Sequence, residues 1–282
     1  SPAGGTSKSG GTNLRVSLNQ ALAADGIVVK GPIKPEYADI VNVDSLRLLA
    51  SLVRSKAFNG IKQLDGSFAG DELDLISLRA LIFRNRAELQ TRLDKGEQLG
   101  FLEETRHIRE ADWVCAPTPA AIADRRVEIT GPTKATMLIN ALNSGASVFM
   151  ADLEDSNAPT WANMMEGQIN LKAANQGTLT APAARYPDGT VRKEYKLNSE
   201  TAILNVRFRG SHLYENHVEI DGQPVPAGLF DFVMYMHANQ EQLRSGEKIP
   251  FFYLPKMEHY LEARVWNRAF EVVQDALGIS RG

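Results

Sequence analysis

In the second half of the chain, residues 125–282, short apolar runs alternate with segments of helical periodicity. This alternation predicts strands joined by crossover helices, and so an α/β fold built on a parallel sheet. The runs are apolar throughout, as in strands covered on both faces. A closed barrel and an open doubly wound sheet both satisfy the pattern, and no dinucleotide or P-loop motif supports a nucleotide-binding version. The strands are expected near 127–130, 147–154, 202–208 and 250–256.

The first half of the chain shows helical periodicity and no alternation of strands and helices. Residues 1–13 are rich in glycine and serine and are expected to form a flexible tail. Residues 14–124 are expected to form a mainly helical domain, because apolar residues recur at helical spacing over 44–56 and about 71–96. Asp44 or Ser45 is the expected cap of the earlier helix.

Composition narrows the classes of partner. Lys and Arg number 31 against 34 Asp and Glu, which gives no support for a nucleic-acid partner. No stretch approaches the roughly 20 apolar residues of a membrane span, so no membrane partner is expected. Cys115 is the single cysteine, which excludes an intramolecular disulfide and suits a reducing compartment. It is expected to be a small buried thiol rather than a nucleophile.

Acidic residues follow the second predicted strand, in the sequence MADLED. Asp152 and Glu154 are two residues apart on a strand and therefore face the same side. Two such carboxylates repel unless a cation compensates them, which favours a hydrated divalent cation over a helix cap or a simple ion pair. Asp155 is the better candidate for capping the next helix.

Basic residues follow the next two predicted strands. Arg207 and Arg209 are expected to share a strand face, and arginine suits planar anions such as carboxylates. Lys256 is more readily explained as a solvated or salt-bridged lysine than as a catalytic one. The five histidines show no metal-ligand spacing and are expected to be structural or to lie on the surface. From the residues alone, an anion-handling site, with or without a metal ion, is expected at the carboxyl edge of the sheet.

Several long strings resemble the malate synthase family, in the shorter form found in bacteria, plants and fungi. The resemblance covers about Ile33 to the C-terminus and rests on ungapped strings rather than on scattered glycines. These strings are ETRHIREADW (104–113), RRVEITGPT (125–133), INALNSGASVFMADLEDSNAPTW (139–161), EGQINL (166–171), NVRFRG, LFDF and FFYLPKME.

The resemblance implies a TIM (β/α)8 barrel, of which only about the first half is present, preceded by a helical clasp over 14–124. It implies acetyl-CoA and glyoxylate as substrates and Mg²⁺ as cofactor. Arg207 matches a catalytic arginine that stabilises negative charge on the glyoxylate oxygen and on the acetyl-CoA enolate. Asp152 and Glu154 match outer carboxylates that hold waters around the ion. Asn157 and Arg209 are weaker candidates for binding CoA or substrate.

The same resemblance implies that the direct Mg²⁺ ligands and the catalytic base follow Gly282. The chain alone is therefore expected to be an inactive fragment that needs a C-terminal half or an oligomeric partner. A relative of the malyl- or citramalyl-CoA lyases and a non-catalytic half-barrel for binding or assembly remain as alternatives. The expected compartment is the cytoplasm or a peroxisome of the glyoxysome type.

Overall fold

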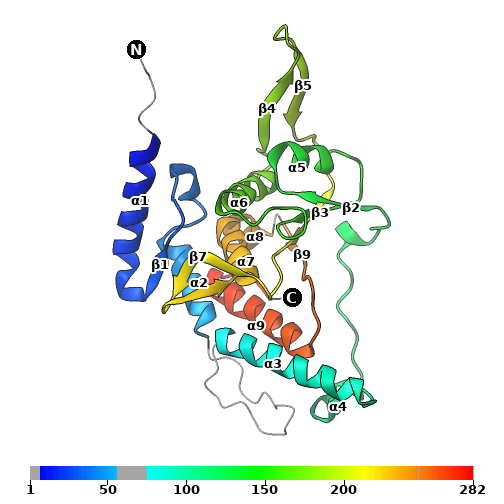
Figure 1. Cartoon of the computed structure of the whole chain (residues 1–282). Helices are drawn as coiled ribbons and strands as arrows, with labels where there is room; N and C mark the ends of the chain where they lie inside the picture. The colour runs from blue at the N-terminus through cyan, green and yellow to red at the C-terminus, as the bar shows by residue number, and fades with distance from the viewer. Residues whose placement is uncertain (1–6, 56–74, 247, 282) are drawn as a thin grey trace.

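The computed structural model describes residues 7–55, 75–246 and 248–281, and Figure 1 shows how their elements are arranged. The helices are α1 (Ser7–Leu22), α2 (Val43–Val53), α3 (Leu75–Asp94), α4 (Arg106–Arg109), α5 (Ala135–Leu142), α6 (Trp161–Asn175), α7 (Ala227–Ala238), α8 (Gln240–Ser245) and α9 (Tyr260–Leu277). The strands are β1 (Ile27–Val29), β2 (Glu128–Pro132), β3 (Val148–Asp152), β4 (Thr180–Arg185), β5 (Val191–Lys196), β6 (Ile203–Arg207), β7 (Tyr214–Ile220), β8 (Gln223–Pro226) and β9 (Phe251–Tyr253).

The centre of the fold is a four-stranded parallel sheet in the order β2-β3-β6-β9. Helix α5 connects β2 to β3, α6 follows β3, and α7 and α8 precede β9. The predicted alternation of strands and helices is therefore confirmed. Over the described residues the sheet is open, with β2 and β9 at its edges, and is not a closed barrel.

Two antiparallel hairpins lie between the parallel strands, where the sequence predicts only connections. The β4–β5 hairpin forms a sheet of its own, and β7–β8 forms a three-stranded sheet with β1. Both hairpins turn at an Asp-Gly pair, a strong local signal for a tight turn. At the β7–β8 turn Asp221 and Gly222 both have positive φ, 53° and 76°, as the hairpin turn with two left-handed residues requires.

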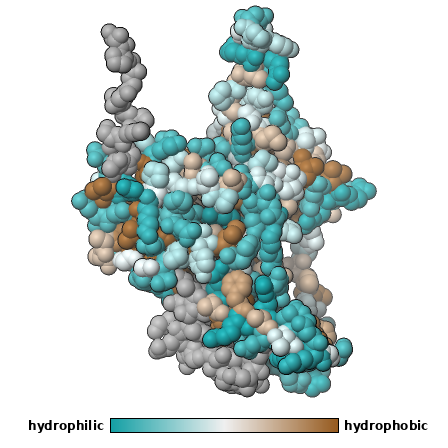
Figure 2. All heavy atoms as spheres, viewed as in Figure 1, coloured by the Kyte–Doolittle hydropathy of each residue, from teal (hydrophilic) through white to brown (hydrophobic). Residues whose placement is uncertain are grey.

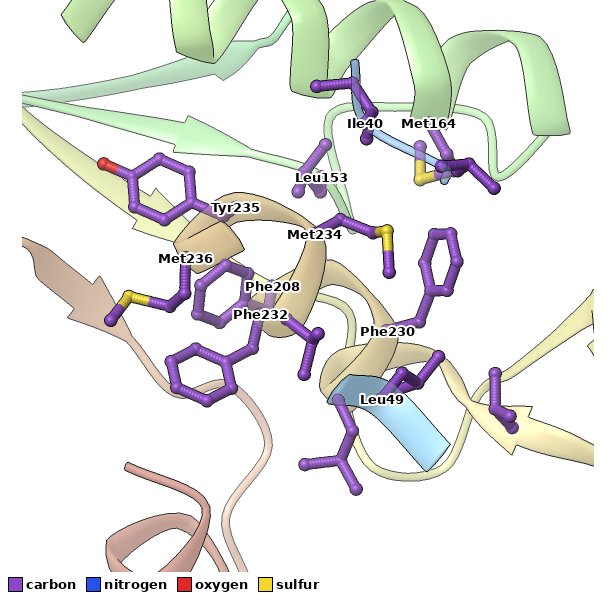
Figure 3. Close-up of a cluster of buried hydrophobic side chains, with 14 of the residues drawn as sticks. Ile40, Leu49, Leu153, Met164, Phe208, Phe230, Phe232, Met234, Tyr235 and Met236 are labelled. Carbon is purple, nitrogen blue, oxygen red and sulfur yellow. The ribbon is translucent and has the colours of Figure 1, made fainter. Parts of the chain in front are cut away.

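Helix α7 is the centre of the hydrophobic core. Every residue from Ala227 to Met236 is buried, so this helix is covered all round. Figure 3 shows Phe230, Phe232, Met234, Tyr235 and Met236 pointing to different sides of it. Aromatic residues from other elements pack against α7 or against one another, namely Phe208, Phe252, Trp266 and Phe270.

The N-terminal elements share this core. Strand β1 pairs with β7, and α2 contacts both α7 and α9. Helix α2 begins at Val43, and its cap is Asn42 and not Asp44 or Ser45 as expected; the Asn42 side chain accepts from the Ser45 N–H in a capping box. Helix α1 begins at Ser7, so part of the expected tail is helical.

The segment that leads from α4 to the sheet is exposed. Every residue from Ala111 to Ala120 is exposed, including Cys115, so the expectation of a buried thiol is wrong. Figure 2 shows hydrophilic residues at the tip of the β4–β5 hairpin. Among the described helices, none combines the length and the apolar character that crossing a bilayer would require.

The aromatic core gives a prediction for Phe232, whose ring lies within 6 Å of the rings of Phe208, Phe252, Trp266 and Phe270. We expect Phe232→Ala to lower the free energy of unfolding by about 3–5 kcal/mol, because it leaves a cavity that the helix cannot close. Phe101→Ala, at a ring that is 85% exposed, should cost less than about 1 kcal/mol. Urea denaturation measures both, and equal losses would contradict the packing described here.

A second prediction concerns alkaline pH. Burial raises the pKa of Tyr235 from 10.0 to about 12, against a smaller opposing effect of the hydrogen bond from Asn175. The folded state therefore holds this proton more tightly than the unfolded state. The stability that results is present below pH 10 and is lost as pH rises from about 10 to about 12. Over this range the free energy of unfolding should fall more steeply for the wild type than for Tyr235→Phe, and parallel curves would contradict this.

Candidate active site at the carboxyl edge of the parallel sheet

The parallel register brings the candidate residues to one edge of the sheet. Asp152, the last residue of β3, pairs with Arg207, the last residue of β6. Arg207 pairs in turn with Tyr253, the last residue of β9. The carboxyl ends of three neighbouring strands therefore meet, as expected for this class of sheet.

Arg207 holds three carboxylates. Its Nη1 lies 3.3 Å from Asp152 Oδ2, and its Nη2 donates to Glu154 Oε2 at 2.7 Å and to Asp155 Oδ2 at 2.6 Å. Burial alone would lower the pKa of the guanidinium, but hydrogen bonds and attraction from these carboxylates outweigh it, so the pKa of Arg207 is raised. The side chain is 13% exposed and carries a fixed positive charge at the mouth of the sheet.

Asp152 and Glu154 are fixed by the backbone as well as by Arg207. Asp152 Oδ1 accepts from the N–H groups of Glu154 and Asp155 at 2.8 and 3.1 Å, and Oδ2 accepts from the Ser156 hydroxyl. Glu154 Oε1 accepts from the Gly210 N–H at 3.1 Å. Strand β3 ends at Asp152, so Glu154 lies in the loop that follows and not on the strand as expected. Both acids nevertheless contact Arg207, and each has further partners that hold its orientation.

Asp155 and Lys256 complete the cluster. Lys256 Nζ lies 2.9 and 3.2 Å from the two Asp155 oxygens and 3.7 Å from Glu154 Oε2. These bonds from Lys256, and then those from Arg207, hold the pKa of Asp155 below its usual range. Asp155 does not cap α6, whose cap is Thr160. Lys256 is salt-bridged, as expected, but its partners are the site acids.

Arg209 lies in a separate environment from Arg207. Its buried guanidinium donates to Asp231 through Nε and Nη2 and to Glu215 through Nη1. Its backbone N–H also donates to Asp231. Strand β6 ends at Arg207, so the alternation that would place both arginines on one face does not continue. The weaker expectation that Arg209 binds substrate has no support here, because its guanidinium is fully engaged inside the protein.

Two further residues adjoin the cluster. Asn157 Nδ2 donates to Thr133 Oγ1 and to the Asp152 carbonyl, and so holds the loop that follows β3. His212 Nε2 lies 3.8 Å from Glu154 Oε1, on the loop after β6. His212 lies in no metal-ligand spacing, so nothing in the sequence singles it out. Its place at the site depends on the turn of this loop at Gly210 and Ser211, and not on any local pattern.

Comparisons with known proteins show the family of the chain. A family profile described as "Malate synthase, TIM barrel domain" matches residues 203–282, which include β6, Arg207 and β9. A malate synthase of Myxococcus xanthus is 45% identical over 267 residues, covering 94% of this chain and 44% of the relative. The chain belongs to the malate synthase family. The malate synthase of Oryza sativa subsp. japonica is 46% identical, and the glyoxysomal malate synthase of Cucumis sativus is 44% identical.

The chain spans less than half the length of these malate synthases. The matches cover 92% of this chain but 42% of the rice and cucumber proteins. The family assignment therefore rests on similarity over nearly the whole of this chain, whereas activity, substrates and partners belong to the whole protein.

The described residues do not fit a directly bound Mg²⁺. Over residues 7–55, 75–246 and 248–281, no group of three or more His, Cys, Asp or Glu side chains is placed to hold a metal ion. The oxygens of Asp152 and Glu154 already accept from Arg207, from a hydroxyl and from backbone N–H groups.

The buried Arg209 network gives a stability prediction. We expect Asp231→Asn to lower the free energy of unfolding by about 3–5 kcal/mol, because it leaves the buried guanidinium without its main counter-charge. Asp188→Asn makes the same charge change at the exposed β4–β5 turn and should cost less than about 1 kcal/mol. Chemical denaturation measures both. A loss for Asp231→Asn no larger than for Asp188→Asn would show that the network is not required for stability.

Proposed function

We propose that the protein carrying this chain is a malate synthase, which condenses acetyl-CoA with glyoxylate and water to give malate and CoA. The observation that carries the proposal is the 45% identity to a malate synthase over 267 residues. In this reaction the acetyl methyl group loses a proton to form an enolate. The enolate carbon then attacks the glyoxylate aldehyde carbon, and water cleaves the thioester of the resulting malyl-CoA.

Arg207 is the proposed catalytic residue of this chain. Negative charge develops on the thioester oxygen in the enolate and on the aldehyde oxygen after attack. A partly buried guanidinium held in place by three carboxylates supplies positive charge without reorganising during the reaction. The orientation of Arg207 is supported by Asp152 and Glu154, which are themselves fixed by backbone N–H groups.

We further propose that the four parallel strands are the first half of a TIM barrel. The family profile over residues 203–282 and the shared direction of the strands support this reading. In such a barrel the carboxyl ends of the strands carry the active site, which is where Arg207 lies. The helical clasp over 14–124 and the completion of the barrel by a C-terminal half belong to the same proposal.

The remaining assignments are proposals of smaller scope. Asp152 and Glu154 are proposed to accept from waters around a Mg²⁺ whose direct ligands are not among the described residues. Asn157 is proposed to lie beside the CoA moiety. The proposed compartment is the cytoplasm or a peroxisome of the glyoxysome type, since the cucumber relative is named glyoxysomal.

The test is CoA release from acetyl-CoA, glyoxylate and Mg²⁺, measured with a thiol reagent. It uses residues 1–282 and the longest natural polypeptide that contains them. We expect release to require both substrates and to come from the longer polypeptide. Arg207→Gln should lower kcat by about 10²–10³, as removal of an oxyanion-stabilising group does.

Arg126→Gln is the matched control, because this arginine is 87% exposed and pairs with Asp124 away from the cluster. It should leave kcat unchanged. If Arg207→Gln keeps kcat/KM within about threefold, the proposed role of Arg207 is wrong. Cleavage of malyl-CoA without condensation would replace the synthase by a lyase.

A further inference from the structure

The three carboxylates around Arg207 are not held equally. Asp152 and Glu154 are buried, and both accept from backbone N–H groups in addition to Arg207. The Asp155 side chain is 55% exposed, and among the described residues its carboxylate is held only by Arg207 and Lys256. Asp155 is therefore the one carboxylate of the cluster that can leave without breaking a bond to the backbone.

The backbone of Lys256 brings its ammonium to this position. Lys256 has a φ of 54°, in the left-handed region that residues with a Cβ adopt infrequently. Such conformations are retained where the surroundings require them, and they concentrate at functional sites. Here the left-handed residue comes three residues after the end of β9. Its Nζ donates to the Asp155 carboxylate, to which Arg207 also donates.

Two buried polar atoms beside the cluster, one donor and one acceptor, are not used by its acids. Among the described residues, the buried Nε of Arg207 has no hydrogen-bond partner. The buried Asn205 Oδ1, two residues earlier on β6 and so on the same strand face, has none either. Polar atoms buried without partners call for an explanation, and a bound polar ligand is one.

We infer that Asp155 is an internal ligand, whose carboxylate occupies the position between Arg207 and Lys256 that an anionic oxygen of a small oxo acid takes. Binding of the oxo acid displaces Asp155 toward solvent and leaves Asp152 and Glu154 in place. Asp155 thereby opposes ligand binding and selects ligands that can engage both cations at once. This inference rests on the proposed function for the choice of glyoxylate as the probe.

The experiment is a titration of the ¹⁵N-labelled 282-residue chain with glyoxylate, followed by NMR of the arginine Nε–H signals and of the backbone amide signals. Arg207→Lys assigns the signal of Arg207. We expect Asp155→Asn to lower the Kd for glyoxylate by about three- to tenfold, because the oxo acid no longer competes with an exposed ion pair. Arg207→Lys should weaken binding, because lysine cannot reproduce the planar fork of donors.

Glu154→Gln is the matched control within the cluster. It also neutralises a carboxylate that accepts from Arg207 Nη2, but Glu154 is held by the Gly210 N–H and is not displaced. Asp188→Asn controls for net charge. The inference is overturned if Asp155→Asn leaves the Kd unchanged or raises it, or if Glu154→Gln lowers it as much. Binding that survives Arg207→Lys unchanged would instead refute the role of Arg207 in the proposed function.

Discussion

The buried Arg209 guanidinium joins three successive segments of the chain into one arrangement. Arg209 follows β6, Asp231 lies in α7, and Glu215 lies in β7, which pairs with β1. An unpaired charge at this depth would be strongly unfavourable, so these elements must come together in one arrangement. The arrangement also fixes the path of the chain just after Arg207, where the Gly210 N–H meets Glu154. A structural ion network thus positions an adjacent polar site.

The polar site and the aromatic core lie on either side of the chain where β6 ends, at Arg207 and Phe208. Phe208 is buried against Phe232, Phe252 and Trp266, whereas its neighbour Arg207 faces the carboxylates. Packing of the aromatic rings therefore keeps the end of β6 from rotating. The aromatic core therefore holds Arg207 in position. A charge stabilises developing negative charge most effectively when it does not have to reorganise during the reaction.

Much of the parallel sheet could be predicted from sequence, because buried strands and crossover helices leave strong periodic patterns. The proximity of Asp152, Glu154 and Arg207 followed from the rule that parallel strands end at one edge. The separation of Arg209 from Arg207 did not, because it depends on where β6 ends. The exposure of Cys115 and the pairing of Asp155 with Lys256 depend on tertiary neighbours, which periodicity does not encode. Neither hairpin was predicted, although both carry Asp-Gly pairs, a local turn signal from which a hairpin can be inferred.

The β4–β5 hairpin projects away from the parallel sheet, as Figure 1 shows, and only its base contacts α5. Its turn at Asp188 and Gly189 is solvated and takes no part in the hydrophobic core. Length changes at such a turn add or remove solvated residue pairs and leave the core contacts as they are. The turn is therefore a natural place to insert an epitope or attach a fluorophore, which would give access to the molecule from outside while the charged cluster stays intact.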